Sequence, residues 1–510
     1  METMEKMADQ YQSSNKAGSM GIRRCAYACH ADKLHPSFAP DIDTNHVCSG
    51  LRFRFFDGVS KIYNYKFFNC MKTTCFSTML LAGVLAAGMS MTSCSNEDEV
   101  INSVDTRAAR SVVVISAGEI PADKLHWTAG NEYHLDGKVA VPVGQTLTID
   151  AGTKVVGLTK SDAVNASALI VPRGAKIEAT GTASNPIVMT AENGQEGGWG
   201  GIVLLGNAPI NQSGDVYIEG IDEDYLPSSL QHVDFRYGGN NPSDNSGILQ
   251  YVRVEFAGAS VSPDNELNAF TFGGVGSGTT VDHCQAYRGA DDGFEFFGGC
   301  VNAKYLVSTA TDDDAFDFDY GYTGKIQFAV ATIDALLTYS GDPNGIECDN
   351  DGSSSSNQPF THPVLSNLTI VGTSTGSAAN ALKSAANFRR NCQFTLANSI
   401  LYGYPTGLLC ETNNASNSIF THNVISVSNG GTAISDDGFD GTENSIVTPD
   451  GIVLGSPWGN YKLAASLRPT DDPAKTGADF SALDGWFTTT TYKGAVAPTG
   501  VNWLTQNWIK

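Results

Sequence analysis

Carboxylate side chains recur at regular spacing in the middle of the chain, and they are the residues best suited to chemistry. The sequence DDGFEFFG at 291–298 aligns with DDAFDFDY at 313–320 and with PNGIECDN at 343–350. In a strand, alternate residues share one face, so stacked copies of this unit would bring equivalent side chains into columns. The alignment predicts two outward acidic columns, with Glu295, Asp317 and Glu347 in the first and Asp319 and Asp349 in the second.

Stacked like charges need compensation. Two carboxylates about 5 Å apart repel by about 3 kcal/mol at an effective dielectric constant of about 20. A bound cation, proton uptake or nearby basic side chains would relieve that repulsion. Further acidic residues crowd the preceding turns, namely Asp291, Asp292 and 312–314. The basic residues close in sequence are Arg288, Lys304 and Lys325, and Lys383 is expected to take the next place in the first column.

The first interpretation of the columns is a cation site, and Ca²⁺ is the expected ion because it takes roughly six to eight oxygen ligands. The spacing Glu347-x-Asp349-x-Asp351-Gly352 resembles the start of an EF-hand loop. Gln358 stands where the closing Glu of such a loop belongs. The predicted metal ligands are Glu295, Asp317, Glu347, Asp349 and Asp351.

The second interpretation is cleavage of a glycosidic bond. Hydrolysis uses two carboxyl groups about 5 Å apart for retention of configuration, or about 9 Å apart for inversion. The coil spacing supplies both separations, and the candidate catalytic residues are Asp292, Glu295 and Asp317. A lyase would need a basic side chain beside a cation, and the three basic residues named above qualify only by their position in the sequence.

The third interpretation is a solvated or carbohydrate-binding face. An aromatic ring offers a large, flat apolar surface on which a sugar ring can stack. Tyr287, Tyr305 and Tyr322 lie near the acidic columns in sequence, and they are the predicted ligand-binding residues.

These side chains must be carried by short strands, because no long amphipathic helical pattern follows residue 111. Short apolar runs alternate with turns rich in Gly, Asn and Asp, and VPVG at 141–144 recurs as VPRG at 171–174. Repeats of about 20–36 residues with variable insertions indicate stacked coils with loops between the strands. The sequence predicts an all-β fold, a right-handed parallel β-helix over 111–450, with a β-propeller as the alternative.

The same alignment predicts what lies inside the coils. The expected core columns are Phe294, Phe316, Ile346, Leu382 and Leu408 in one, and Phe296, Phe318, Cys348, Ser384 and Cys410 in the other. Two coils of about 4.8 Å separate Cys348 from Cys410, which is beyond the Cα separation of about 7 Å that a disulfide can bridge. Both are therefore predicted to be buried thiols outside any disulfide.

The residues ahead of the β-helix carry targeting signals. The uncharged apolar run after Met71 is too short to cross a bilayer and suits a secretory signal at 71–93. It ends at Cys94 in a pattern that resembles the lipobox of bacterial lipoproteins, so Cys94 is predicted to carry the lipid that holds the protein on the outer membrane. Residues 1–70 are expected to be a disordered extension ahead of the true start, and 94–110 a flexible acidic tether.

The last segment, 451–510, differs in composition from the repeats. It contains four of the six tryptophans of the chain, Trp458, Trp486, Trp503 and Trp508. The open end of a β-helix exposes strand edges that natural proteins cover. We therefore predict a C-terminal capping segment that covers the last coil.

Charge excludes one class of partner. The chain has 31 Lys and Arg against 54 Asp and Glu, a formal net charge of −23. A nucleic-acid partner is not expected, because such a surface cannot neutralise phosphates. No nucleotide-binding loop occurs in the sequence, so no nucleotide partner is expected either.

Several segments together resemble a known group of proteins. They are WGGIVLLG at 199–206, RYGG at 236–239, DNSG at 244–247, VRVEFAG at 252–258, ELN at 266–268 and DDGFEFFGG at 291–299. The sequence is similar to uncharacterised surface β-helix lipoproteins of the Bacteroidetes. This resemblance implies the β-helix fold and a cell-surface location, and it implies no catalytic residues.

We therefore expect a lipid-anchored cell-surface β-helix that binds extracellular glycan or another surface polymer. A polysaccharide-degrading hydrolase or lyase that uses the column carboxylates is the first alternative, and a structural envelope protein is the second. An exposed aromatic row would favour binding. Carboxylates that converge with a base in a cleft would favour catalysis.

Overall fold

The structure is a computed structural model that describes residues 110–510 except 222, 263–264, 340–342, 412–414, 429, 437–438, 440, 448–453 and 455–464. The predictions for 1–70, 71–93 and Cys94 lie outside the described residues. Within the described part, no helix has the length and apolar character needed to cross a membrane.

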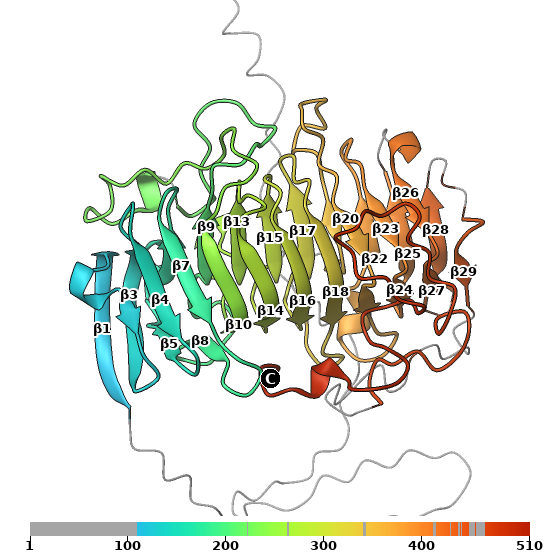
Figure 1. Cartoon of the computed structure of the whole chain (residues 1–510), viewed down its shortest axis with the longest axis horizontal. Coiled ribbons are helices and arrows are strands. Elements are labelled where there is room, and N and C mark those ends of the chain that lie inside the picture. The colour runs from blue at the N-terminus through green and yellow to red at the C-terminus, as the bar shows by residue number, and fades with distance from the viewer. Residues whose placement is uncertain are drawn as a thin grey trace, which may run out of the picture. The chain divides into compact units, whose positions relative to one another are not determined.

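The described chain winds into a right-handed parallel β-helix, as predicted (Figure 1). The first coils contain β1 (Ser111–Glu119), β2 (His126–Trp127), β3 (Asn131–Ala140), β4 (Thr146–Asp150), β5 (Lys154–Gly157), β6 (Ala168–Val171), β7 (Lys176–Thr180), β8 (Ile187–Ala191) and β9 (Ile202–Leu205). The middle coils contain β10 (Gly247–Glu255), β13 (Phe270–Gly273), β14 (Thr280–Tyr287), β15 (Phe294–Phe297), β16 (Asn302–Thr309), β17 (Phe316–Asp319), β18 (Lys325–Thr332) and β19 (Glu347–Cys348).

The last coils contain β20 (Val364–Ser366), β21 (Thr369–Val371), β22 (Ser384–Phe388), β23 (Thr395–Ala397), β24 (Ile400–Tyr402), β25 (Thr406–Cys410), β26 (Ile419–Thr421), β27 (Val424–Ser426), β28 (Thr432–Asp436) and β29 (Ser445–Ile446). A separate hairpin is formed by β11 (Ser260–Ser262) and β12 (Asn265–Glu266). Short 3₁₀ turns are η1 (Ala122–Lys124), η2 (Ala163–Asn165), η3 (Glu223–Tyr225), η4 (Ala378–Asn380), η5 (Ala415–Asn417) and η6 (Trp503–Thr505).

Three stacks of strands form the walls of the coils. One stack runs through β6, β9, β13, β15, β17, β19, β22, β25 and β28, each strand paired in parallel with the next; we call it the ladder sheet. The long strands β10, β14, β16 and β18 bend and contribute to both other stacks, so β18 pairs with β20 in one stack and with β21 in the other.

The bend in these long strands is made by bulky residues in an unusual backbone conformation. Tyr251, His283, Tyr305 and Phe328 all have φ between 51° and 61°. A left-handed backbone conformation is strained for side chains of this size, so contacts with neighbouring residues must stabilise these four positions. Their rings stack in sequence with centroids 4.4, 4.3 and 5.1 Å apart. We call this stacked row the aromatic corner.

The core of the ladder sheet confirms the predicted phenylalanine columns. Phe294 lies opposite Phe316, and Phe296 opposite Phe318, with ring centroids 5.6 and 5.2 Å apart. Cys348 continues the second column after Phe318. Cys348 and Cys410 are buried thiols outside any disulfide, as predicted.

The predicted register is wrong one coil later. The structure pairs Cys348 with Phe388 rather than Ser384, and Phe388 in turn pairs with Cys410. The reason is an insertion between β19 and β22, where residues 378–380 form η4 and strand structure begins only at Ser384. Leu382 and Lys383 therefore precede the strand, and Lys383 does not occupy the next position of the acidic column.

The described residues 465–510 of the C-terminal segment lie along the side of the β-helix, whereas the prediction placed this segment over the last coil. Figure 1 shows this segment in red beside the later coils, with its end near β10. Side-chain amides hold it to the coils: Gln327 exchanges two hydrogen bonds with the backbone of Thr488 (2.7 and 2.8 Å), and Asn398 exchanges two with Asp479 (both 2.8 Å). Trp508 meets His283 of the aromatic corner edge to face at 5.4 Å.

This placement has a physical cause in the outward face of the coils. A column of mostly apolar residues there, Val307, Val330, Thr369, Ile400 and Val424, would be solvent-exposed without a cover. The C-terminal residues Leu504, Trp508 and Ile509 join the same buried cluster. Burial of apolar surface therefore draws the segment to the side of the coils.

The phenylalanine column yields a stability prediction. Phe296 is fully buried and stacks on both Phe272 and Phe318. We expect Phe296→Ala to lower the free energy of unfolding by about 3–5 kcal/mol, because the vacated space cannot be refilled by the rigid coils. Urea unfolding followed by circular dichroism measures this. The control Val501→Ala, at an 81% exposed residue, should change it by less than about 0.5 kcal/mol, and equal effects would contradict the packing.

Candidate functional site

The first acidic column exists as predicted. In the ladder sheet Glu295 pairs with Asp317, and Asp317 with Glu347, on three successive coils. Thr271 precedes Glu295 in the column, and Asn387 follows Glu347. The parallel register therefore places three like-charged side chains one above another between two neutral polar ones.

The side chains of the first acidic column are largely buried, whereas the third interpretation of the sequence expected a solvated face. Only 7% of Glu295 and 9% of Glu347 is exposed. The segment 207–239 covers this side of the ladder sheet, because its residues Ile218 and Tyr237 pack into one cluster with outward residues of the sheet such as Phe297. The carboxylates are thus sheltered from water by an insertion between β9 and β10.

Turn residues ahead of the strands join the column and make three groups of carboxylates. Within each group, one potential ligand atom per residue lies within 4.8 Å of the others. The groups are Asp291, Asp292 and Asp313; Asp292, Glu295 and Asp317; and Asp314, Asp317 and Glu347. Asp292 and Asp317 each belong to two groups, so the site is continuous across the coils. We call it the acidic ladder.

Two predicted metal ligands lie elsewhere. Asp349 accepts hydrogen bonds from Arg389 Nε at 2.9 Å and from Arg390 Nη1 at 2.6 Å. The Asp351 carboxylate accepts hydrogen bonds from the backbone N–H groups of Ser353 and Ser355 in its own turn. Neither belongs to the three groups, so the EF-hand-like spacing does not form a common cage with Glu295 and Asp317. Asp351 instead caps a tight turn, a common use of Asp in loops.

Burial raises the pKa of the ladder carboxyls. The pKa of Asp292 lies well above its usual value because the side chain is desolvated and because Asp291 and Glu295 are close. Desolvation and then the charge of Asp319 raise the pKa of Asp317. Desolvation, followed by the charge of Glu219, raises the pKa of Glu295. At neutral pH the ladder must therefore hold protons or cations.

A counter-charge at the site comes from an arginine that the sequence analysis did not place here. Arg389, just after β22, forms ion pairs with Glu347 and with Asp349. It lowers the pKa of Glu347, but desolvation and the charge of Asp317 outweigh it and bring that pKa to about 8. The sequence alignment paired Cys348 with Ser384 instead of Phe388, so it did not place Arg389 beside Glu347. The correct pairing depends on the length of the insertion between β19 and β22.

Two further carboxylates reach the site from the covering loops. Glu219 lies in the segment 207–239 and Glu266 in β12, and their mutual repulsion adds to desolvation to raise the pKa of Glu219 to about 7. Both also raise the pKa of Asp291, so they face the same acidic centre. No repeat or spacing could have located them, because both belong to insertions outside the coil pattern.

Buried polar atoms beside the ladder lack hydrogen-bond partners among the described residues. They include Asn268 Oδ1, Thr271 Oγ1 and Asn387 Oδ1, on side chains that are 1%, 0% and 7% exposed. Asn268 donates through its Nδ2 to Glu295, and Asn387 donates through its Nδ2 to Glu347 at 3.3 Å. A buried unsatisfied oxygen costs free energy, so such atoms next to carboxylates fit a site shaped for a ligand.

The three predicted ligand-binding tyrosines do not form a row beside the ladder. Tyr322 is buried in the core, where it packs on Phe318 and its hydroxyl donates to Val301 O at 2.8 Å. Tyr305 belongs to the aromatic corner and is met edge-on by Trp503. Tyr287 ends β14, and Lys510 lies over its ring at 4.7 Å. Stacking within the fold, rather than on a ligand, explains their positions.

The basic residues proposed for a lyase are also elsewhere. Arg288 pairs with Glu196, and Lys325 pairs with Asp484. Lys304 lies over the ring of Trp486 at 4.5 Å. Two of the three therefore contact the C-terminal segment, and none is an available base at the ladder.

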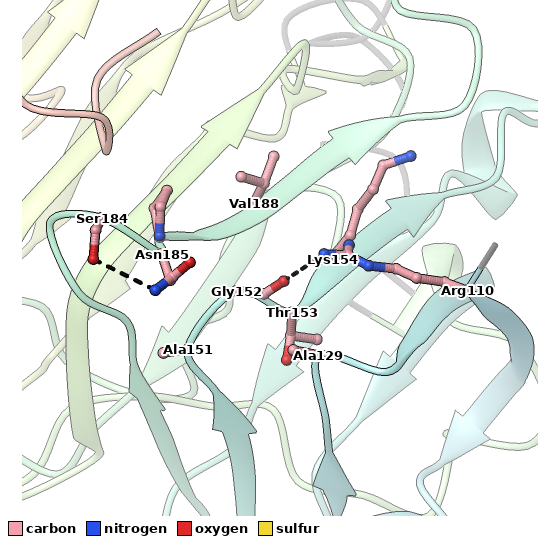
Figure 2. Close-up of a pocket in the computed structure, with 10 residues that line it drawn as sticks. Arg110, Ala129, Ala151, Gly152, Thr153, Lys154, Ser184, Asn185 and Val188 are labelled. Carbon is pink, nitrogen blue, oxygen red and sulfur yellow. Dashed lines mark hydrogen bonds between the residues drawn. The ribbon is translucent and has the colours of Figure 1, made fainter. Parts of the chain in front are cut away.

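An open cavity of about 420 Å³ lies among the first coils (Figure 2). Arg110 and Lys154 are its charged lining residues. Arg110 donates to Gly152 O at 2.9 Å, and Lys154 pairs with Glu132 at 3.0 Å. Because both cations already have partners in the protein, the cavity is a weaker candidate site than the acidic ladder.

The fold and the site together define a β-helix with converging carboxylates on one outer face. The sequence matches the family described as pectate-lyase like beta helix domain over residues 118–445. The chain belongs to this family. No curated protein and no solved structure matches it.

Glu219 gives a prediction for the dependence of stability on pH. Its pKa is about 7 in the folded protein and about 4.5 when unfolded, so the folded state binds more protons between these values. Stability should therefore fall as pH rises through this window. Glu219→Gln, which mimics the protonated form, should make the protein more stable at pH 8 by on the order of 2–3 kcal/mol and leave it nearly unchanged at pH 4.

Urea unfolding in EDTA at the two pH values measures this difference. The control is Glu178→Gln, because Glu178 is an exposed residue of β7. If Glu219→Gln were no more stabilising at pH 8 than the control, the acidic surroundings assigned to Glu219 would be wrong.

Proposed function

We propose that this protein binds an extracellular polysaccharide through Ca²⁺ held on the acidic ladder. The observation that carries the proposal is the convergence of buried carboxylates beside unsatisfied oxygens, where the ion pair with Arg389 involves only the Glu347 end of the column. Membership of the pectate-lyase-like family supports a polysaccharide as the class of ligand.

The middle group of carboxylates is the best-equipped position for the ion. Asp292, Glu295 and Asp317 would supply three carboxylate oxygens, and Asn268 Oδ1 and Thr271 Oγ1 are neutral oxygens beside them. Ca²⁺ takes roughly six to eight oxygen ligands, so positions would remain for hydroxyl or carboxylate oxygens of a sugar that approaches past the partly exposed Asp291 and Asp317. The ion would also offset the mutual repulsion of these carboxylates. An acidic protein could in this way bind an anionic glycan.

The location we propose is the outer membrane, with the β-helix facing the exterior. The support comes from the sequence, where an apolar signal at 71–93 leads to Cys94 as the lipidated residue. An extracellular polysaccharide would be within reach of a protein held there by its lipid.

Calcium binding predicts a stability change. At a Ca²⁺ concentration 100 times the dissociation constant, stability should rise by about 2.7 kcal/mol over the EDTA-treated protein, because the ion binds only the folded state. Thermal unfolding with Ca²⁺ and with EDTA measures the rise. Asp317→Asn should abolish it, whereas the exposed Asp123→Asn should retain it. An unfolding temperature that does not respond to Ca²⁺ would contradict the calcium site.

A second function, glycoside hydrolysis, is favoured by one distance. One carboxylate oxygen from each of Asp292, Glu295 and Asp317 lies within 4.8 Å of the others, and retaining enzymes place their two carboxyl groups about 5 Å apart. One carboxyl group with a raised pKa would protonate the leaving oxygen, while an ionised neighbour would attack the sugar.

Hydrolysis is tested by the release of reducing ends from acidic polysaccharides. We expect Asp292→Asn and Asp317→Asn to lower the rate at least about 100-fold, because each removes a proton-transfer or nucleophilic group. Asp123→Asn should retain the full rate. Polysaccharide that is bound but recovered at unchanged length would exclude hydrolysis and leave the binding function.

A further inference from the structure

Two buried cysteines on successive coils of the ladder sheet face each other. Cys348 lies in β19, and Cys392 lies in the turn that follows β22, one coil further along. Both side chains are 0% exposed and belong to the same core cluster. Their thiols are hydrogen-bonded to each other, and neither cysteine is in a disulfide.

The turn that carries Cys392 is fastened to the coil of Cys348. Before Cys392, Arg389 N–H donates to Cys348 O at 3.0 Å. After Cys392, Gln393 N–H donates to Thr361 O at 2.8 Å. Arg390 and Asn391 adopt φ of 48° and 68°, which reverses the chain and directs it back toward the core. The approach of the two thiols is therefore a fixed feature of the fold.

Aromatic rings hold the same turn from within. Phe388, opposite Cys348 in register, and Phe394 stack with their centroids 3.6 Å apart. Cys392 lies on the stretch of chain that joins these two rings. Residues 388–394 thus form a short closed turn that leaves Cys392 little freedom to move away from Cys348.

We propose that Cys348 and Cys392 form a disulfide that links successive coils when the protein folds under oxidising conditions. A disulfide needs Cα atoms within about 7 Å and converging Cβ atoms, which neighbouring coils about 4.8 Å apart can provide. Cys410 is a poorer partner for Cys348, because the register places Phe388 between them and separates them by two coils.

The chemistry is thiol–disulfide exchange with a small-molecule disulfide such as oxidised glutathione. One cysteine thiolate attacks the glutathione disulfide and releases one glutathione thiol. The second cysteine thiolate then attacks the mixed disulfide and releases the other. The two cysteines lose two protons and two electrons, and the reagent gains both electrons as it becomes two thiols.

Burial dictates when this reaction occurs. Both cysteine side chains are 0% exposed, so a dissolved disulfide reagent cannot reach either thiol in the folded protein. The exchange therefore belongs to folding, before the coil of β22 closes over β19. Once formed, the bond would lie inside the core and resist reductants.

The test is to refold the full chain from urea with oxidised glutathione, in parallel with a dithiothreitol control, and to map tryptic peptides without reduction. The absence of Lys and Arg within 326–382 and 391–461 places Cys348 in the peptide 326–383 and Cys392, with Cys410, in the peptide 391–462. We expect these two peptides to be joined after oxidative refolding, with a mass 2 Da below their sum, and to be separate in dithiothreitol.

Variants identify which cysteine takes part. Cys410→Ser should retain the joined peptides, whereas Cys392→Ser should lose them and still give the circular dichroism spectrum of the wild type. We also expect the oxidised wild type to unfold at a higher temperature than the reduced protein. Separate peptides after oxidative refolding of the wild type would overturn the proposal, and so would a link that survives in Cys392→Ser.

Discussion

Parallel hydrogen bonding between successive coils is the constraint on which the rest of this structure depends. It places each residue of a strand directly beside its equivalent on the next coil, at the strand spacing of about 4.8 Å. For Phe294 and Phe316, or Phe296 and Phe318, this register is favourable, because flat rings stack and exclude water. The same hydrogen bonds bring Glu295, Asp317 and Glu347 together, where the register is electrostatically costly. One backbone rule thus creates both the core and the candidate site.

The surroundings of the acidic column show how the fold tolerates this cost. Thr271 and Asn387 end the run with neutral groups, and Arg389 supplies a positive charge at the Glu347 end. Desolvation, together with the remaining repulsion, raises the pKa values of Asp292, Glu295 and Asp317. Hydrophobic residues at these positions would be more favourable for stability alone, so a cluster of this kind is typical of a site where function opposes stability.

The sequence predicted the parts of the molecule that repeat. The columns from Phe294 to Cys348 could be aligned because residues 291–320 contain two coils with almost no insertion. Prediction failed beyond β19, because the conformation of the following insertion cannot be derived from the repeat. The insertion shifts the register of β22, so Phe388 rather than Ser384 lies beside Cys348 in the core, and Arg389 lies beside Glu347. Glu219 reaches the ladder from a loop that has no counterpart in other coils. A sequence repeat predicts the register between neighbouring coils. The contacts of an insertion become known only from its three-dimensional structure.

The C-terminal segment and the segment 207–239 each cover one outer face of the coils, and they differ in the side chains that they bring to that face. On one outer face, the apolar column that includes Val330 and Ile400 is covered by Leu504 and Trp508 of the C-terminal segment, which side-chain amides such as Asn398 also hold. This cover closes a hydrophobic surface, and its aromatic residues are used in packing. On the ladder sheet the cover is the segment 207–239, which packs through Ile218 and Tyr237 but also adds Glu219 to the acidic centre.

A cover that only protected the ladder sheet would bring positive or apolar side chains to a row of carboxylates. The segment 207–239 instead adds a further negative charge, and Tyr237 leaves its buried hydroxyl without a partner among the described residues. Both features raise the free energy of the protein without a cation at the ladder, and both make cation binding there more favourable. The ladder sheet, rather than the face closed by the C-terminal segment, is therefore the side of the molecule on which we propose that a ligand binds.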